Sequence, residues 1–156
     1  MIQISIPGYK VLNIKNLVMD FNGTMAEDGK MIPGLKARLE ILKEICEIFV
    51  ITADTFGSVE SELKDLPVRI RILDQQNQIE AKREFIHQLG ASGCACIGNG
   101  RNDSSMLDDA ALGIIVLQKE GASVFAISKA DIITGNIIDA LDLLIFPKRL
   151  IATLRS

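Results

Sequence analysis

The first residues able to do chemistry stand at the end of a short apolar run. The run 17–19 (Leu-Val-Met) leads to Asp20, after which the stretch 22–24 (Asn-Gly-Thr) supplies an amide, a bend and a hydroxyl. A parallel strand delivers an acid in this way to the carboxyl edge of an α/β sheet, where such folds hold their ligands. The alternative is that Asp20 only caps the element that follows it. This stretch alone does not choose between a reactive acid and a capping acid.

Three later segments carry groups that fit one kind of chemistry. Thr52 ends a second apolar run, Lys82 stands early in an expected helix, and the glycine-rich stretch 98–103 follows a third run. A carboxylate can attack as a nucleophile, while a threonine hydroxyl and a lysine ammonium can hold phosphoryl oxygens. Carboxylate and amide oxygens suit Mg²⁺. Taken alone, Lys82 reads as a solvated helix residue and Asp103 as an acid near a helix N-terminus, but the order and spacing together predict phosphoryl transfer.

The pattern of the chain indicates how these residues are positioned. Apolar runs typical of buried strands alternate with segments of helical periodicity, which predicts a doubly wound α/β domain with a mainly parallel sheet and helices on both faces. An N-terminal β-hairpin precedes it. We expect hairpins over 2–14 and 25–32; strands over 17–19, 47–51, 68–73, 94–97, 112–117 and 130–134; and helices over 35–45, 57–63, 78–89, 106–111, 121–128, 137–144 and 147–154.

Composition bounds the function. The chain has 156 residues, enough for one domain over 1–156, and it is 48% hydrophobic with a formal net charge of -3. A chain with this net charge lacks the excess of basic residues that binding to nucleic acid or to an anionic membrane requires. We see neither a signal peptide nor an apolar run that could span a membrane, so we expect a cytoplasmic protein. We expect the three cysteines to be small buried residues rather than members of a disulfide framework. We expect the only histidine, His87, to be solvated rather than catalytic.

The four segments resemble, in order, the motifs of the haloacid dehalogenase superfamily: Asp20 to Thr24, Thr52, Lys82 and 98–103. From 98 to 131 the sequence is most similar to the phosphorylation domain of P-type ATPases, and small proteins of that kind resemble the chain most closely. The resemblance implies that Asp20 forms an aspartyl-phosphate and that Thr52 and Lys82 hold the phosphoryl group.

The same resemblance implies a wider ligand set. The phosphate would also meet groups at Gly23, Ala53 and Asn102. Mg²⁺ would be held by Asp20, the main-chain carbonyl of Asn22, Asn99 and Asp103. The segments between the motifs have no room for the cap domain of many relatives, so the resemblance implies a core without a cap. A small phosphorylated substrate would then reach Asp20 openly, or under a second copy of the chain in a homo-oligomer.

Two residues depart from the family pattern. Phosphatases of this superfamily usually carry an aspartate where this chain has Asn22, and asparagine cannot exchange a proton near neutral pH. Asn99 likewise stands where relatives have a metal-binding aspartate. We therefore expect a slow Mg²⁺-dependent phosphohydrolase with Asp20, Asn22, Thr52 and Lys82 as catalytic residues. The alternative is a catalytically weak or inactive regulatory protein that binds phosphate and Mg²⁺, and a scaffold with an incidental motif is the third interpretation.

Overall fold

Strands and helices alternate along the computed structural model, which describes residues 1–53, 58–74 and 76–156. The strands are β1 (Ile2–Ser5), β2 (Val11–Ile14), β3 (Asn16–Asp20), β4 (Ala26–Glu27), β5 (Lys30–Met31), β6 (Glu47–Thr52), β7 (Arg69–Ile72), β8 (Cys94–Gly98), β9 (Leu112–Val116) and β10 (Ile132–Thr134). The helices are α1 (Leu35–Leu42), α2 (Ser58–Leu63), α3 (Gln78–Leu89), α4 (Ser104–Asp109), α5 (Val124–Ile127), α6 (Ile137–Ile145) and α7 (Pro147–Leu154), with 3₁₀ turns η1 (Ala91–Gly93) and η2 (Arg101–Asp103).

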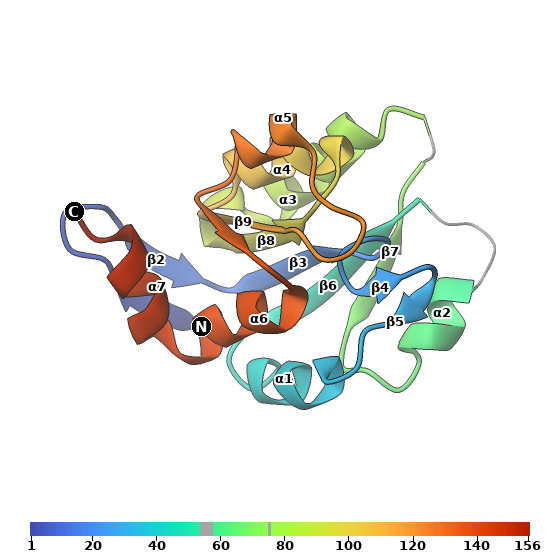
Figure 1. Ribbon diagram of the computed structural model, residues 1–156, viewed down its shortest axis with the longest axis horizontal. Coiled ribbons are helices and arrows are strands. Elements are labelled where there is room, and N and C mark those ends of the chain that lie inside the picture. Colours follow the sequence, from blue (N-terminus) through green and yellow to red (C-terminus); the bar gives the residue numbers. More distant parts are fainter. Residues whose placement is uncertain (54–57, 75) are drawn as a thin grey trace.

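A central sheet of parallel strands organises the fold. Its order is β10-β9-β8-β3-β6-β7, so the chain first builds outward from β3 through β6 and β7 and then returns to the other side of β3 at β8. The strand order reverses beside β3, and such a switch point is where doubly wound sheets hold their ligands. The fold is therefore the predicted doubly wound α/β architecture (Figure 1).

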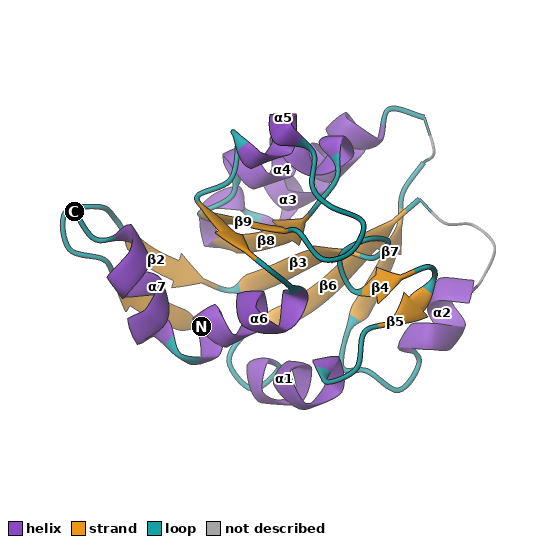
Figure 2. Cartoon of the chain, viewed as in Figure 1, coloured by secondary structure: helices purple, strands orange, loops and turns teal. Residues whose placement is uncertain are grey.

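Helices cover both faces of the sheet. Successive side chains of a strand point to opposite faces, so an apolar strand needs a helical layer on each side to be buried. In β3, Leu17 and Met19 belong to the cluster of α1, α6 and α7, whereas Val18 belongs to the cluster of α3, α4 and α5. Figure 2 shows these two helical layers on either side of the strands. Aliphatic residues fill both clusters, which agrees with the low aromatic content of 4%.

The N-terminal hairpin of β1 and β2 packs beside α7, and both chain ends lie at this side of the molecule (Figure 1). Alternate side chains of the hairpin, such as Ile4 and Leu12, are buried against the core. At its tip the Tyr9 hydroxyl and the Lys10 ammonium both donate to the carboxylate of Asp131, with Lys10 Nζ 3.0 Å from Oδ1. The hairpin is thus tied to the sheet at its tip as well as through its apolar face.

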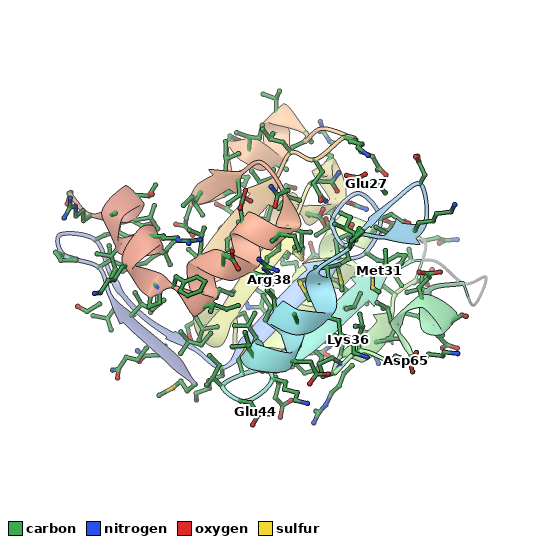
Figure 3. All side chains as sticks on the ribbon, turned by 60° about the horizontal axis from the view of Figure 1, so that its bottom comes forward. Glu27, Met31, Lys36, Arg38, Glu44 and Asp65 are labelled. Atoms are coloured by element: carbon green, nitrogen blue, oxygen red, sulfur yellow. The ribbon has the colours of Figure 1, made fainter. Side chains whose placement is uncertain are left out.

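The second hairpin, β4 and β5, forms a flap that we define as residues 25–32. Asp28 and Gly29 turn it with φ of 49° and 75°, which suits a two-residue hairpin turn. In Figure 3 Glu27 lies on this flap, and Arg38 lies on the side of α1 toward α6. Arg38 Nε donates to Asp142 Oδ1 of α6 at 2.8 Å, which fixes the helix that follows the flap.

Most elements have the bounds expected from the sequence. The predicted bounds of helices 78–89 and 147–154 are confirmed, and strand 68–73 is the edge strand β7. The first helix ends at Leu42 rather than 45, which leaves Ile45 38% exposed. The segment 121–128, expected to be one helix, contains only the shorter helix α5. Gly121 has a φ of 76°, which is not helical, so the helix cannot begin there. The expected helix 57–63 begins at a residue outside the described ones. No helix among the described residues is long and apolar enough to cross a membrane.

Candidate active site

The polar residues singled out in the sequence meet at the carboxyl edge of the sheet. Asp20 is the last residue of β3, Thr52 is the last residue of the adjacent β6, and the loop 98–103 continues from β8 on the other side of β3. Parallel pairing places these strand ends side by side. The sheet therefore brings together groups that lie far apart in the sequence, as predicted.

Lys82 joins the two acids of the site. It lies in the first half of α3, and its Nζ is 2.6 Å from Asp20 Oδ1 and 2.6 Å from Asp103 Oδ1. The Lys82 side chain is 1% exposed, so its ammonium is almost fully removed from water. The alternative of a solvated helix lysine does not fit this position. A buried ammonium between two carboxylates is paired on both sides, and these charged hydrogen bonds fix the orientation of the lysine side chain.

Burial sets the protonation of this triad, which comprises Asp20, Lys82 and Asp103. Burial raises the pKa of Asp20 to about 7, with a further contribution from the charge of Asp103, and Lys82 opposes the rise. Burial alone would lower the pKa of Lys82, but Asp103 and Asp20 more than offset this effect and hold its pKa above the ordinary value. Lys82 therefore remains charged, whereas Asp20 takes up a proton near neutral pH when no metal ion is bound beside it.

Asp103 is the anchor of the glycine-rich loop. Its Oδ2 accepts hydrogen bonds from the backbone N–H groups of Asn99 at 3.0 Å and Gly100 at 2.8 Å. A Cβ on Gly98 would lie 2.5 Å from the carboxyl carbon of Asp103, so only glycine allows this close approach. Both carboxylate oxygens of Asp103 have partners and the residue is fully buried. The carboxylate therefore fixes the loop and Lys82 rather than facing the cavity.

A cavity of about 520 Å³ opens over the triad. The residues that line it are mostly polar and come from the ends of β3 and β6, from the segments after β3, β6, β8 and β9, and from α3. They are Asp20, Asn22, Thr52, Ala53, Gln78, Lys82, Asn99, Gly100, Asn102 and Glu120. Such a polar, open cavity suits a small hydrophilic ligand rather than an apolar one.

Most of the predicted site residues lie in this cavity, but two do not. Gly23 adopts a φ of 74°, and its N–H donates to the carbonyl of Ala26 at 2.9 Å, so it is not available to a phosphate in this arrangement. Asp103 is buried beneath the cavity, as described above. Direct metal ligation by Asp103 would require this carboxylate to leave Lys82 or the loop amides.

Three lining residues were missed by the sequence reasoning, namely Gln78, Gly100 and Glu120. Gln78 is the first residue of α3, and its Oε1 accepts from Asn102 Nδ2 at 2.6 Å. Glu120 follows β9, a strand that runs parallel to β8. The signal was present for Glu120, because a polar residue shortly after a parallel strand is expected at the same edge of the sheet.

The donor chemistry of the cavity fits a divalent cation that prefers oxygen. Asp20 offers a carboxylate, Asn22 a main-chain carbonyl and Asn99 an amide oxygen, which are hard ligands of the kind Mg²⁺ takes together with waters. No group of three or more His, Cys, Asp or Glu within the described ranges forms a metal cluster. A cation here would therefore depend on amide and carbonyl oxygens as well as on carboxylates.

Comparison with known proteins gives relatives in one archaeon. The protein MJ0073 of Methanocaldococcus jannaschii, described as uncharacterized, is 51% identical over 88 residues, which cover 56% of this chain and 85% of that protein. The chain belongs to the same family as MJ0073. A second uncharacterized protein of this archaeon, MJ0072, is 54% identical over 39 residues, covering 25% of the chain and 89% of that protein. No sequence-family profile matches the chain.

Solved structures identify the fold of the chain. A 3-deoxy-D-manno-octulosonate 8-phosphate phosphatase of Moraxella catarrhalis, in complex with magnesium, phosphate and the sugar, superimposes with a TM-score of 0.73 at 22% identity over 92% of the chain and 94% of that protein. The cobalt-bound phosphatase of Haemophilus influenzae gives 0.71 at 14% identity over the same shares, 92% and 94%. The chain thus has the fold of haloacid dehalogenase-like hydrolases.

Proposed function

We propose that the protein is a phosphohydrolase that transfers the phosphoryl group of a phosphate monoester to Asp20 and then to water. The observation that carries this proposal is the convergence of Asp20, Thr52 and Lys82 on one polar cavity at the switch point of the sheet. The resemblance to phosphatases of the same fold supports the proposal. An incidental motif in a scaffold would not account for a buried lysine held by two acids.

The residues of the chain divide the reaction between them. A carboxylate oxygen of Asp20 attacks phosphorus, the bond from phosphorus to the ester oxygen breaks, and an aspartyl-phosphate forms while the alcohol leaves with a proton taken from solvent. Lys82 and Thr52 hold the phosphoryl oxygens, and the fixed ammonium offsets the charge of the transition state. Water then attacks phosphorus, which releases inorganic phosphate and restores the carboxylate. The groups of Ala53 and Asn102 complete the phosphate site.

Mg²⁺ is the cofactor in this proposal, with Asp20, the Asn22 carbonyl and Asn99 as its ligands. Bound there, it would act as a Lewis acid on a phosphoryl oxygen and lower the pKa of Asp20. The magnesium and cobalt of the two phosphatase structures support a divalent ion in a protein of this fold. Asp103 contributes to this site by fixing Lys82 and the loop 98–103.

Asn22 makes the proposed reaction slow. It can neither protonate the leaving oxygen nor take a proton from the attacking water. Loss of a general acid or base typically lowers a rate by about 10²–10⁴, which is roughly 3–5 kcal/mol of barrier. The similarity to the phosphorylation domain of P-type ATPases fits this feature, because they too lack an acid at this position. We propose an aspartyl-phosphate that forms more readily than it hydrolyses.

The substrate in this proposal is a small phosphorylated molecule. We propose that residues 1–156 form one core without a cap, which functions in the cytoplasm and meets its substrate directly or under a neighbouring copy of the chain. The net charge of -3 supports a partner other than nucleic acid.

A phosphate-binding protein with little turnover is the second candidate, because Asn22 and Asn99 are neutral where phosphatases of this fold carry aspartates. Phosphate release from a panel of sugar and other monoesters with Mg²⁺ separates the two. We expect Asp20→Asn to be inactive and Asn22→Asp to exceed the wild type. Equal background rates for all three proteins would favour the binding protein.

A further inference from the structure

A short segment after β9 is fastened across the loop that follows Asp20. We define residues 118–121 as the clasp. Gln118 Nε2 donates to the main-chain oxygens of Gly23 at 2.9 Å and Thr24 at 2.5 Å. Lys119 Nζ pairs with Glu27 Oε2 of the flap at 3.0 Å. These contacts join segments about a hundred positions apart in the sequence and place the clasp at the rim of the cavity.

The loop after β8 fastens the other side of the clasp. The Asn99 side chain donates from Nδ2 to the carbonyl of Gly121 at 3.1 Å, and the N–H of Ser123 donates to the Asn99 carbonyl at 2.9 Å. The Asn99 amide oxygen accepts from the Thr24 hydroxyl at 3.5 Å. The amide of Asn99 is therefore oriented by the clasp, with its nitrogen toward Gly121 and its oxygen on the opposite side.

Glu120 reaches from the clasp into the cavity. A Cβ placed on Gly23 would lie 2.8 Å from Glu120 Oε2 and 2.4 Å from Asn99 Nδ2, so the two side chains converge over Gly23. Glu120 Oε1 accepts one long hydrogen bond, 3.4 Å from the N–H of Asp28. Glu120 forms no ion pair within the described part of the chain. The neighbouring Lys119 pairs with Glu27 rather than with Glu120. The carboxylate is held beside the Asn99 amide without being neutralised.

The charge balance of the cavity indicates a role for the Glu120 carboxylate. Asp20 and Glu120 are the two carboxylates among the described residues that line the cavity, because Asp103 is buried and bound to Lys82 and the loop. Lys82 offsets much of the charge on Asp20. A divalent ion held by Asp20, the Asn22 carbonyl and the Asn99 amide would then meet little net negative charge. Mg²⁺ is ordinarily bound through one or two carboxylates, and without Glu120 the site would offer only Asp20, whose charge Lys82 partly offsets.

We propose that Glu120 is the second carboxylate of the divalent-metal site and supplies the charge that Asn99 does not carry. The inference rests on the proposed function, which calls for the ion. It adds a ligand from a third segment, after the loop following β3 and the loop following β8, and the clasp places it next to the amide that it compensates. Glu120 binds the ion directly or through one of its waters, and both arrangements provide the same charge.

Metal binding without substrate tests the assignment. Free Mn²⁺ is measured by electron paramagnetic resonance as protein is titrated, and Mg²⁺ affinity follows from its competition with Mn²⁺. We expect Glu120→Gln to weaken Mn²⁺ and Mg²⁺ binding at least tenfold. Adding Asn99→Asp to this variant should recover most of the affinity, because it returns one carboxylate to the site.

Glu27→Gln is the matched control, since it removes a glutamate that contacts the clasp but does not line the cavity. We expect it to bind Mn²⁺ within about twofold of the wild type, with unchanged circular dichroism for all variants. Unaltered binding by Glu120→Gln, an equal loss in both glutamine variants, or a wild type that binds neither ion would each overturn the inference. A protein that binds Mn²⁺ through Glu120 yet releases no phosphate would contradict the proposed hydrolysis alone.

Discussion

Replacing Lys82 by methionine tests the buried triad, because the change removes the ammonium and keeps a side chain of similar length. In the native protein Lys82 Nζ lies 2.6 Å from a carboxylate oxygen of Asp20 and of Asp103. Without it two buried acids face each other with no cation between them. Removing one partner of a buried ion pair typically costs about 3–5 kcal/mol, so we expect a loss of this size in the free energy of unfolding at pH 8.

The other variants of the triad set the scale of this effect. Asp20→Asn leaves Lys82 paired with Asp103 and removes a carboxylate whose ionised form is disfavoured by burial, so we expect it to cost less than Lys82→Met at pH 8. Arg83→Met is a matched control on the same helix, where the exposed guanidinium pairs with Asp109 at 2.6 Å. A surface pair contributes about 0–1 kcal/mol.

Urea unfolding without metal measures these differences as shifts of the midpoint at constant slope. The cost of Lys82→Met should shrink at pH 5.5, because Asp20 then carries a proton and the repulsion between the acids disappears. The reasoning is refuted if Lys82→Met costs no more than Arg83→Met, or if its cost is the same at both pH values.

Three further predictions concern the nucleophile and its loop. Asn22→Asp should raise steady-state phosphate release by about 10²-fold or more, the effect of a restored general acid and base; a rate equal to the wild type would show that proton transfer is not limiting. Gly23→Ala should destabilise the protein by at least about 1–2 kcal/mol in urea, because φ is 74° and the new Cβ would lie 2.4 Å from Asn99 Nδ2; unchanged stability would mean that the loop relaxes freely. In metal-free protein burial raises the pKa of Asp20 from its ordinary value of 3.8 to about 7, so the folded state binds the proton more tightly and stability falls as pH rises from 4 to 7. Asp20→Asn should flatten this decline in urea titrations, and an unaltered decline would assign it to other groups.

The sequence predicts the architecture well because its signals are local. Apolar runs and helical periodicity are properties of neighbouring residues, and parallel strands then force their carboxyl ends to one edge. That reasoning places Asp20, Thr52 and the loop 98–103 together before any coordinates are known. It also identifies Lys82 as part of the site, through its spacing in the motif.

What the sequence could not give depends on contacts between distant segments. Asp103 carries an ordinary ligand type, yet the structure turns both its oxygens to Lys82 and to loop amides. Gly23 supplies a turn, but its N–H is used by Ala26. Glu120 follows a parallel strand and could be expected at this edge of the sheet. Its entry into the cavity depends on the clasp, which lies across the loop after Asp20 and which no periodicity encodes. Side-chain direction and hydrogen-bond partners are decided by packing, so these roles could be assigned only in three dimensions.

Acid-quenched mass spectrometry of the phosphorylated peptide tests the central claim most directly. The wild type, Asn22→Asp and Asp20→Asn are incubated with acetyl phosphate and Mg²⁺, quenched in acid and digested. The account predicts a phosphoryl group on Asp20 that persists in the wild type, decays faster in Asn22→Asp and is absent from Asp20→Asn. A phosphoryl group on another residue, or none on Asp20 while phosphate is released, would contradict it.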